Sequence, residues 1–277
     1  MTYLSNIFIY PIKSLAGIQV NNWDITETGL RYDRQWMLID EHQQFLSQRR
    51  LPKMALIKIQ IAPQNLTVSA PDKADLILAL NPDKPTKTVI ATLWHDQCEA
   101  QIISREANQW FSDFLQMPCQ LVYQAKNSIR TVDQKYALKD DQTSFSDGFP
   151  FLITSEASLA LLNEQVGLPL TMQRFRPNLV IADCSSYAED TWRKISIGKI
   201  NFRLPKPCSR CSVPQIDPET ALSDKEPLRT MARTRKWQNK VFFGQNALHD
   251  QLGHLRINDV VNIIETGPNQ PPIPSEK

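Results

Sequence analysis

The stretch LIKIQI at residues 56–61 alternates apolar and polar side chains, and it decides the class of the fold. Ile57, Ile59 and Ile61 share one face, whereas Lys58 and Gln60 lie on the other. A period of two is the pattern of a β-strand with one buried face. Segments of similar length recur in the first hundred residues, at 3–10, 17–25, 34–40, 75–80, 87–93 and 97–103. Short strands at this spacing indicate an antiparallel barrel or sandwich.

Helical patterns are fewer, so the sequence predicts a mainly β protein with a few helices, an α+β fold. Residues 104–115 bring Trp110, Phe111, Phe114 and Leu115 together at helical spacing, and we expect these side chains in the core. A second helix is expected in TSEASLALLNEQVG, where Thr154 or Ser155 is placed to cap it. Further strands are predicted at FPFLI, PNLVIA and INFRL, and near residues 255–264.

Two changes in composition mark boundaries. Residues 125–148 are polar and weakly patterned, as in a loop or linker. The end of the chain, GPNQPPIPSEK, holds four prolines and is expected to be unstructured. We therefore predict a first domain over residues 1–124, a second over residues 125–267 and a flexible tail over residues 268–277.

The composition excludes several classes of protein. Of the 277 residues, 42% are hydrophobic and 22% are charged, which is ordinary for a soluble globular protein. There is no apolar run of the length that a membrane span needs, and no basic region precedes the apolar N-terminus as in a secretory signal. Five cysteines without dense spacing favour a reducing, cytoplasmic setting. Glycine-rich phosphate loops are absent.

The sequence CSRC at 208–211 is the sharpest local motif. A structural zinc site needs four ligands, and no second pair of Cys or His stands nearby; Cys98, Cys119 and Cys184 are expected to be small buried hydrophobes. A thioredoxin-type pair should open a helix, but this motif leads into a loop with proline. A third interpretation is a single thiolate that binds a soft metal, with Arg210 favouring the ionised sulfur. The spacing alone leaves these interpretations open.

Cations near the ends of predicted strands are the second clue. Lys13 and Ser14 follow the first strand, Arg34 begins another, and Arg174 and Arg176 precede a third. Such side chains are usually solvated, but turns between apolar strands can aim them at one anion. The planar fork of arginine suits phosphate and the polar edges of heterocycles.

These segments resemble the MOSC family, named for the C-terminal domain of molybdenum cofactor sulfurase, and in particular its branch of mitochondrial amidoxime reducing components and their bacterial relatives. The resembling segments span nearly the whole chain in family order. They are YPIKSLAG at 10–17, LRYDRQWMLID at 30–40, FPFLITSEASL at 149–159, RFRPNLVI at 174–181, YAEDTW at 187–192, CSRCSVPQIDPET at 208–220, KEPL at 225–228 and FFGQN at 242–246.

The resemblance implies an N-terminal β-barrel-like domain followed by a MOSC β-barrel domain, with a molybdenum–molybdopterin cofactor in the cleft between them. Cys211 matches the cysteine that ligates molybdenum, and it is the expected catalytic residue. Ser155 and Ser209 equally suit capping and turn roles, and Cys208 is expected to be a buried neighbouring thiol. The segments implied to hold the pterin and its phosphate contain Lys13, Ser14, Arg34, Ser155, Arg176, Asn178, Ser209 and Arg210.

The implied activity is that of a molybdenum-dependent oxidoreductase. It removes oxygen from small N-hydroxylated compounds (amidoximes, hydroxylamines and N-hydroxylated bases) with two electrons and two protons, a reductive detoxification. Some bacterial relatives append an iron–sulfur domain, which needs four clustered cysteines that are absent here. Electrons are therefore expected from a separate ferredoxin, flavoprotein or cytochrome b5 type protein. Ala221 stands where relatives often carry glycine, so the turn after DPET is expected to differ in shape.

Two other functions fit the sequence less well. One is a non-catalytic carrier of the cofactor or a sulfur-transfer module, although the pyridoxal-phosphate desulfurase portion is absent. The other is the binding of a nucleic acid or another anionic partner through the basic run at 229–240. This run is either a solvated face or a docking surface for an acidic electron-transfer partner. Nucleic-acid binding is not expected, because the net charge is near zero. No membrane partner is expected.

Overall fold

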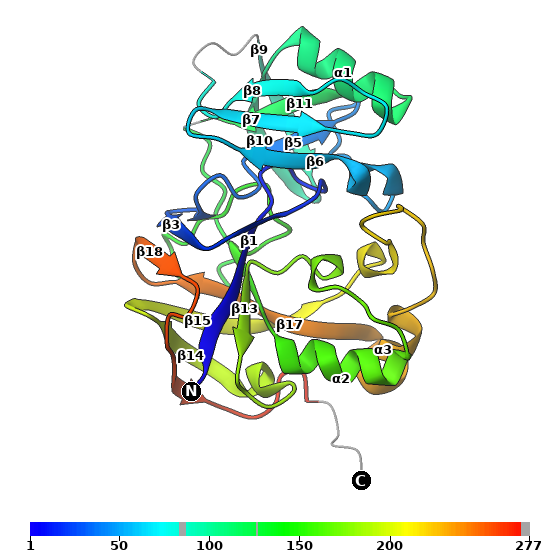
Figure 1. The fold of residues 1–277 in the computed structure, drawn as a ribbon. Coiled ribbons are helices and arrows are strands. Elements are labelled where there is room, and N and C mark those ends of the chain that lie inside the picture. The colour runs from blue at the N-terminus through cyan, green and yellow to red at the C-terminus, as the bar shows by residue number, and fades with distance from the viewer. Residues whose placement is uncertain (83–86, 126, 273–277) are drawn as a thin grey trace.

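The computed structural model describes residues 1–82, 87–125 and 127–272. Far more of the described residues are in β-strands than in helices, which confirms the predicted mainly β class. Figure 1 shows two bodies: an upper body with strands β5 to β11 and helix α1, and a lower body with strands β12 to β17 and helices α2 and α3.

One nine-stranded sheet forms most of the lower body. Only β12 and β13 run parallel; the other neighbours in the sheet are antiparallel. In sheet order the strands are β19 (Val261–Thr266), β14 (Trp192–Ile197), β15 (Ile200–Ser209), β17 (Lys240–His249), β12 (Phe151–Ser155), β13 (Leu179–Ala182), β1 (Tyr3–Ile9) and β2 (Ile18–Val20), with β16 (Lys236–Trp237) paired to β17.

Two smaller sheets form the upper body, and a third lies beside the lower one. The four-stranded sheet contains β5 (Trp36–Ile39), β11 (Gln120–Gln124), β10 (Asp96–Ile102) and β9 (Lys87–Leu93). The three-stranded sheets contain β6 (Lys58–Ile61), β7 (Asn65–Ser69) and β8 (Leu76–Ala79), and β18 (Gly253–Arg256), β3 (Asn22–Thr26) and β4 (Gly29–Leu30). The alternation that predicted β6 is confirmed, because Ile57 and Ile59 are buried while Lys58 and Gln60 are exposed.

The helices follow from local signals. Helix α1 (Arg105–Leu115) begins at Ser104, whose hydroxyl accepts the Ala107 N–H, and Trp110 and Phe111 are buried as predicted. Of the helices in the described part of the chain, none has the length and apolar character that crossing a lipid bilayer takes. The remaining helices are α2 (Glu156–Val166), α3 (Leu228–Thr234) and four 3₁₀ turns, η1 (Pro52–Leu56), η2 (Met172–Arg174), η3 (Ala188–Thr191) and η4 (Val213–Gln215).

The N-terminal strands join the two bodies. β1 pairs with β13 in the large sheet, and β3 pairs with β18 from the C-terminal part of the chain. Ile18 and Ile61 pack against the apolar cores of both bodies. The first thirty residues therefore belong mainly to the lower body, although they lie well before residue 124.

The sheets are open in the described structure. The path of the large sheet ends at β2 on one side and at β19 on the other. An isolated bridge between Tyr3 and Val260 links the two regions without a ladder of hydrogen bonds. The large sheet thus does not close into the continuous hydrogen-bonded ladder of a barrel, which was expected for the MOSC domain, because one bridge cannot replace such a ladder.

Two polar segments are held more firmly than their composition suggests. Within the segment predicted as a loop, residues 127–148 form no helix or strand ladder, but Phe145 and Ser144 are buried, and Arg130 donates to the backbone carbonyls of Ser144 and Ser146. Within the segment predicted as a flexible tail, Gln270 donates from its backbone to the carbonyl of Asp190 at 2.9 Å. Residues 273–277 lie outside the described residues.

Candidate cofactor site

Arg34 is the centre of a cluster of cations from separate segments. It lies between β4 and β5, and its guanidinium donates to the side-chain oxygen of Asn178 at 3.0 Å. It also donates to the carboxylate of Asp33 at 2.6 Å and to the backbone carbonyl of Arg176 at 3.2 Å. Residues about 140 positions apart in the sequence are therefore in direct contact.

Tyr10 supports two of these cations. The guanidinium carbons of Arg34 and Arg176 lie 4.3 and 4.2 Å from the centre of its ring. Its hydroxyl donates to the carbonyl of Pro177, and burial raises the pKa of Tyr10 to about 12. A side chain at Gly17 would lie 2.4 Å from the same ring, which explains the glycine that ends YPIKSLAG. Sequence reasoning missed Tyr10; its place beside Lys13 in that motif was the available signal.

Asp33 is the acidic partner that orients Arg34. It is almost fully buried and also accepts the backbone N–H of Tyr10 at 2.8 Å. Burial raises the pKa of the carboxyl, and the charge of Arg34 acts against that rise. Asp33 was also missed, although it precedes Arg34 in the sequence.

Lys13 reaches the loop that precedes β12. Lys13 is only 6% exposed. Its ammonium group donates to the carbonyl of Phe145 at 2.8 Å and to the carboxylate of Asp147 at 2.5 Å. Burial lowers the pKa of Lys13, and the carboxylate of Asp147 opposes this effect. The predicted loop at 125–148 thus borders the cation cluster.

Arg176 and Arg210 lack an acidic partner within ion-pair distance in the described part of the chain. Arg176 donates to the carbonyl of Leu15 at 2.6 Å, and burial together with Arg34 lowers its pKa to about 10, so it remains charged at neutral pH. Arg210 donates to the carbonyl of Phe175 at 2.6 Å, while its buried Nε has no hydrogen-bond partner. Partly buried positive charge without an ion-pair partner is costly, so this cluster favours an anion.

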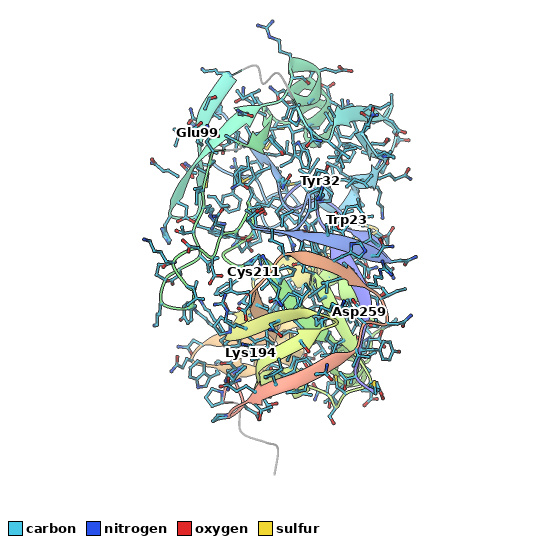
Figure 2. The ribbon with its side chains drawn as sticks, turned by 90° about the vertical axis from the view of Figure 1, so that its left-hand side faces the viewer. Trp23, Tyr32, Glu99, Lys194, Cys211 and Asp259 are labelled. Atoms are coloured by element: carbon cyan, nitrogen blue, oxygen red, sulfur yellow. The ribbon has the colours of Figure 1, made fainter. Side chains whose placement is uncertain are left out.

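Cys211 is the second residue after β15, and it lies in the lower body near the upper one, as Figure 2 shows. Its thiol is partly exposed, and the preceding backbone N–H of Arg210 donates to the carbonyl of Val241 at 2.8 Å. The loop that follows is held by the ion pair of Arg174 with Asp217. In the described residues no group of three or more His, Cys, Asp or Glu side chains could hold a metal ion, so any metal here would rely on few protein ligands.

The side chain of Arg210 contacts the other cysteine of the motif. Its Nη1 lies 3.0 Å from the sulfur of Cys208, whereas the sequence suggested that it favours the ionised form of the ligand thiol. Cys208 is partly exposed rather than buried. The reason is geometric: residues 208 and 210 lie two apart on an extended chain and point to the same side.

The three serines of the expected site differ in their surroundings. Ser14 and Ser209 lie beside Lys13 and Arg210, and Ser209 is exposed. Ser155 is not brought to the cluster: it is fully buried, caps α2 through the Ser158 N–H, and donates to Glu189 at 2.9 Å. Asn178, also buried, accepts the N–H of Leu152 and donates to the carbonyl of Phe8, so it ties β12 to β1 as well as holding Arg34.

Two family models match this chain. The MOSC N-terminal beta barrel domain covers residues 1–118, and the MOSC domain covers residues 140–262. Fold and site therefore define a two-domain MOSC protein. The chain belongs to the family of the mitochondrial amidoxime-reducing components and molybdenum cofactor sulfurases, which confirms the resemblance seen in the sequence.

The relatives differ in how much of their length the chain covers. Mitochondrial amidoxime-reducing component 1 is 33% identical in Mus musculus and 32% identical in Homo sapiens, over 94% of this chain and 82% of each relative. The molybdenum cofactor sulfurase of Oryza sativa subsp. japonica is 31% identical over 87% of this chain, but the match covers only 32% of that protein. The chain thus spans about a third of the sulfurase and most of the amidoxime-reducing component.

Proposed function

We propose that this protein is a molybdenum-cofactor-dependent reductase of N-hydroxylated compounds. The observation that carries the proposal is the partly exposed thiol of Cys211, next in the chain to Arg210, together with two arginines, Arg176 and Arg210, that have no acidic partner at ion-pair distance among the described residues. Such a set fits a ligand that combines a phosphate with a soft metal. The names of the similar amidoxime-reducing components support the reductase, since the alignment with those proteins covers 94% of this chain.

Each residue of the cluster has a distinct part in this function. Cys211 would ligate molybdenum through its thiolate. Arg176 and Arg210 would bind the phosphate, because they have positive charge to offer, while Arg34 and Lys13 are already paired with Asp33 and Asp147. Asp33 keeps Arg34 oriented through a bond that burial protects from water. When bound, the cofactor supplies the two-electron chemistry that cleaves the N–O bond, and the chain positions it.

The test begins with protein purified from a host that makes the cofactor. Molybdenum content, fluorescence of the oxidised pterin and turnover of an aromatic amidoxime with reduced methyl viologen are measured together. We expect near-stoichiometric molybdenum and pterin in the wild type. The Cys211→Ser variant should lose turnover and most of its molybdenum, whereas Cys184→Ala, which alters a partly buried cysteine beside Glu189, should keep both. Full activity of Cys211→Ser would refute the proposal.

The rival proposal is a non-catalytic cofactor carrier or sulfur-transfer module, favoured by the similarity to molybdenum cofactor sulfurase. A carrier would contain molybdenum and pterin but would not reduce an amidoxime with any donor. The turnover assay therefore separates the two functions. Residence in the cytoplasm and an external electron donor are part of the reductase proposal.

A further inference from the structure

The basic run at 229–240 divides into buried and exposed residues. Arg235 is buried and pairs with Asp190 at 2.5 Å, and Arg229 pairs with Glu226 at 2.7 Å. Three cations of the run remain exposed and, within the described residues, have no acidic partner at ion-pair distance. We name this surface the basic hairpin. It consists of Lys236, Trp237 and Lys240 from the β16–β17 hairpin, together with Arg233 at the end of α3.

The backbone projects this hairpin into solvent. Trp237 pairs with Lys240, and the two residues between them, Gln238 and Asn239, have φ values of 45° and 63°. Positive φ at both central residues is the mark of a tight hairpin turn. The ring of Trp237 is partly exposed and lies 6.2 Å from the ring of Phe242, so the sheet supports it.

The basic hairpin lies at the same end of the large sheet as Cys211. Ser209 pairs with Phe242, and Arg210 donates its N–H to the carbonyl of Val241. Lys240 is the next residue toward the turn, and Cys211 is the next residue on the facing chain. The cations therefore flank the segment that carries the thiol.

Acidic side chains of the adjoining loop do not cancel this charge. Asp217 is paired with Arg174 at 2.5 Å, and Glu219 is paired with Lys58 at 2.7 Å. Asp224 and its neighbour Lys225 are both exposed, so their opposite charges offset each other. The surface beside Cys211 thus presents positive charge around a partly exposed tryptophan.

We infer that the basic hairpin is the docking surface for a small acidic electron-transfer protein that reduces the centre at Cys211. The inference rests on the proposed reductase function, which requires an electron source. Opposite charge speeds the encounter of such partners, and tryptophan is frequent among residues that dominate binding energy. Docking here brings the carrier to the thiol end of the sheet, where the path for electrons is short.

The number of electrons that each turnover needs determines how often the partner must bind. One N-hydroxylated substrate takes two electrons and two protons and yields the reduced nitrogen compound and water. A one-electron carrier such as a plant-type ferredoxin must therefore dock twice per turnover, and each docking oxidises one carrier molecule. Weak, fast and salt-sensitive binding suits this repeated exchange.

The test uses the holoenzyme with two acidic carriers, reduced plant-type ferredoxin and reduced flavodoxin. Turnover is compared between the wild type and a Lys236→Glu/Lys240→Glu double variant. The matched control is Lys199→Glu, an exposed lysine in the turn at the opposite end of β15. β15 has ten residues, so the two ends are roughly 30 Å apart.

We expect the double variant to lose about tenfold or more of the carrier-supported rate at low ionic strength, with the difference shrinking as salt is added. Turnover with saturating methyl viologen should be unchanged, and Lys199→Glu should match the wild type with every donor. Equal loss in both variants, no loss in the double variant, or failure of both carriers to reduce a viologen-active wild type would overturn the docking surface. Absence of viologen turnover would instead count against the reductase.

Binding of oxidised ferredoxin to each form is measured by calorimetry in the same buffers. This readout does not depend on turnover, so it tests the surface even where the catalytic proposal fails. We expect the dissociation constant to rise about tenfold in the double variant and to stay at the wild-type value in Lys199→Glu. An unchanged dissociation constant in the double variant would overturn the inference.

Discussion

At the scale of single residues, the site is built with left-handed backbone conformations that glycine usually takes. Ser14, Arg34 and Arg176 have φ values of 66°, 48° and 56°, and all three belong to the expected cofactor site. For a residue with a side chain this conformation costs about 1 kcal/mol or more. Such strain often accumulates where side chains must point at a ligand. The chain has only 8 glycines, so it accepts the strain and keeps the cations.

Ala221 has the same conformation without a charge to position. Its φ is 57°, in a turn closed by its N–H to the carbonyl of Asp217 at 2.8 Å. Ala221→Gly should therefore raise the free energy of unfolding by about 1 kcal/mol, because glycine adopts this φ without strain. The melting temperature should rise by about 2 °C.

Calorimetric melting curves check this prediction. The matched control is Ala232→Gly, on the exposed face of α3, where glycine should lower stability by about 1 kcal/mol. If both substitutions lowered the melting temperature equally, the backbone at Ala221 would not be strained.

At the scale of elements, η3 is joined to the start of α2 through a buried carboxyl group. Glu189 accepts from the hydroxyls of Ser155 at 2.9 Å and Ser158 at 2.8 Å. Burial first, and then the neighbouring Asp190, raise the pKa of Glu189 to about 7, and the hydroxyls act against this rise. The serine predicted at the cofactor site thus serves the packing of these elements.

This shift makes the stability of the junction depend on pH. The unfolded carboxyl releases its proton near its ordinary pKa of 4.5, whereas the folded one retains it to about 7. The folded state therefore binds more protons in this window, and the free energy of unfolding should fall as pH rises from about 4.5 to 7. The loss for this one group is about 3 kcal/mol.

Glu189→Gln should remove this contribution, because an amide does not titrate. Urea unfolding of both proteins between pH 4.5 and 8 measures the difference in their free energies of unfolding. We expect the free energy of unfolding of the variant, relative to that of the wild type, to increase steadily from pH 4.5 to 7 and to stay constant above pH 7. The values at pH 4.5 serve as the internal reference for the lost hydrogen bonds. Parallel curves over the whole range would show that Glu189 is ionised in the folded protein.

At the scale of the whole molecule, the cation cluster joins parts of the chain that are far apart. Lys13 and Arg34 come from the N-terminal third, and Arg176 and Arg210 from the C-terminal half. An anion bound among them binds only the folded arrangement, so it should stabilise the whole protein. We expect the cofactor-loaded protein to melt at a higher temperature than the cofactor-free protein.

The variant Arg176→Met tests the origin of that difference. Arg176 has no acidic partner at ion-pair distance in the described part of the chain, so its removal should leave the cofactor-free protein at least as stable as the wild type, and cofactor binding should weaken roughly tenfold or more. Arg31→Met, which breaks an exposed pair with Asp24, is the control and should keep the full stabilisation by the cofactor. Calorimetry of all loaded and cofactor-free forms gives the comparison. Identical melting curves of loaded and cofactor-free wild type would contradict the coupling.

The sequence by itself determined the local elements of this protein. The alternation around Ile59 predicted β6, the spacing of Trp110 and Phe111 predicted α1, and the serine before Glu156 predicted the start of α2. These signals are local, because a strand or an amphipathic helix repeats its buried face every two or about 3.6 residues. The same segments, read in order, carried the family resemblance and named Cys211, Arg34 and Arg176.

Only the tertiary structure decided which of those residues meet. It brought Arg34 to Asn178 and Arg176, added Tyr10 and Asp33, and kept Ser155 away at Glu189. It also split the basic run into a buried pair at Arg235 and an exposed hairpin. The physical reason is that contact between distant segments depends on strand pairing and on the burial of charge. Neither strand pairing nor the burial of charge can be inferred from the pattern of residues that are neighbours in the sequence.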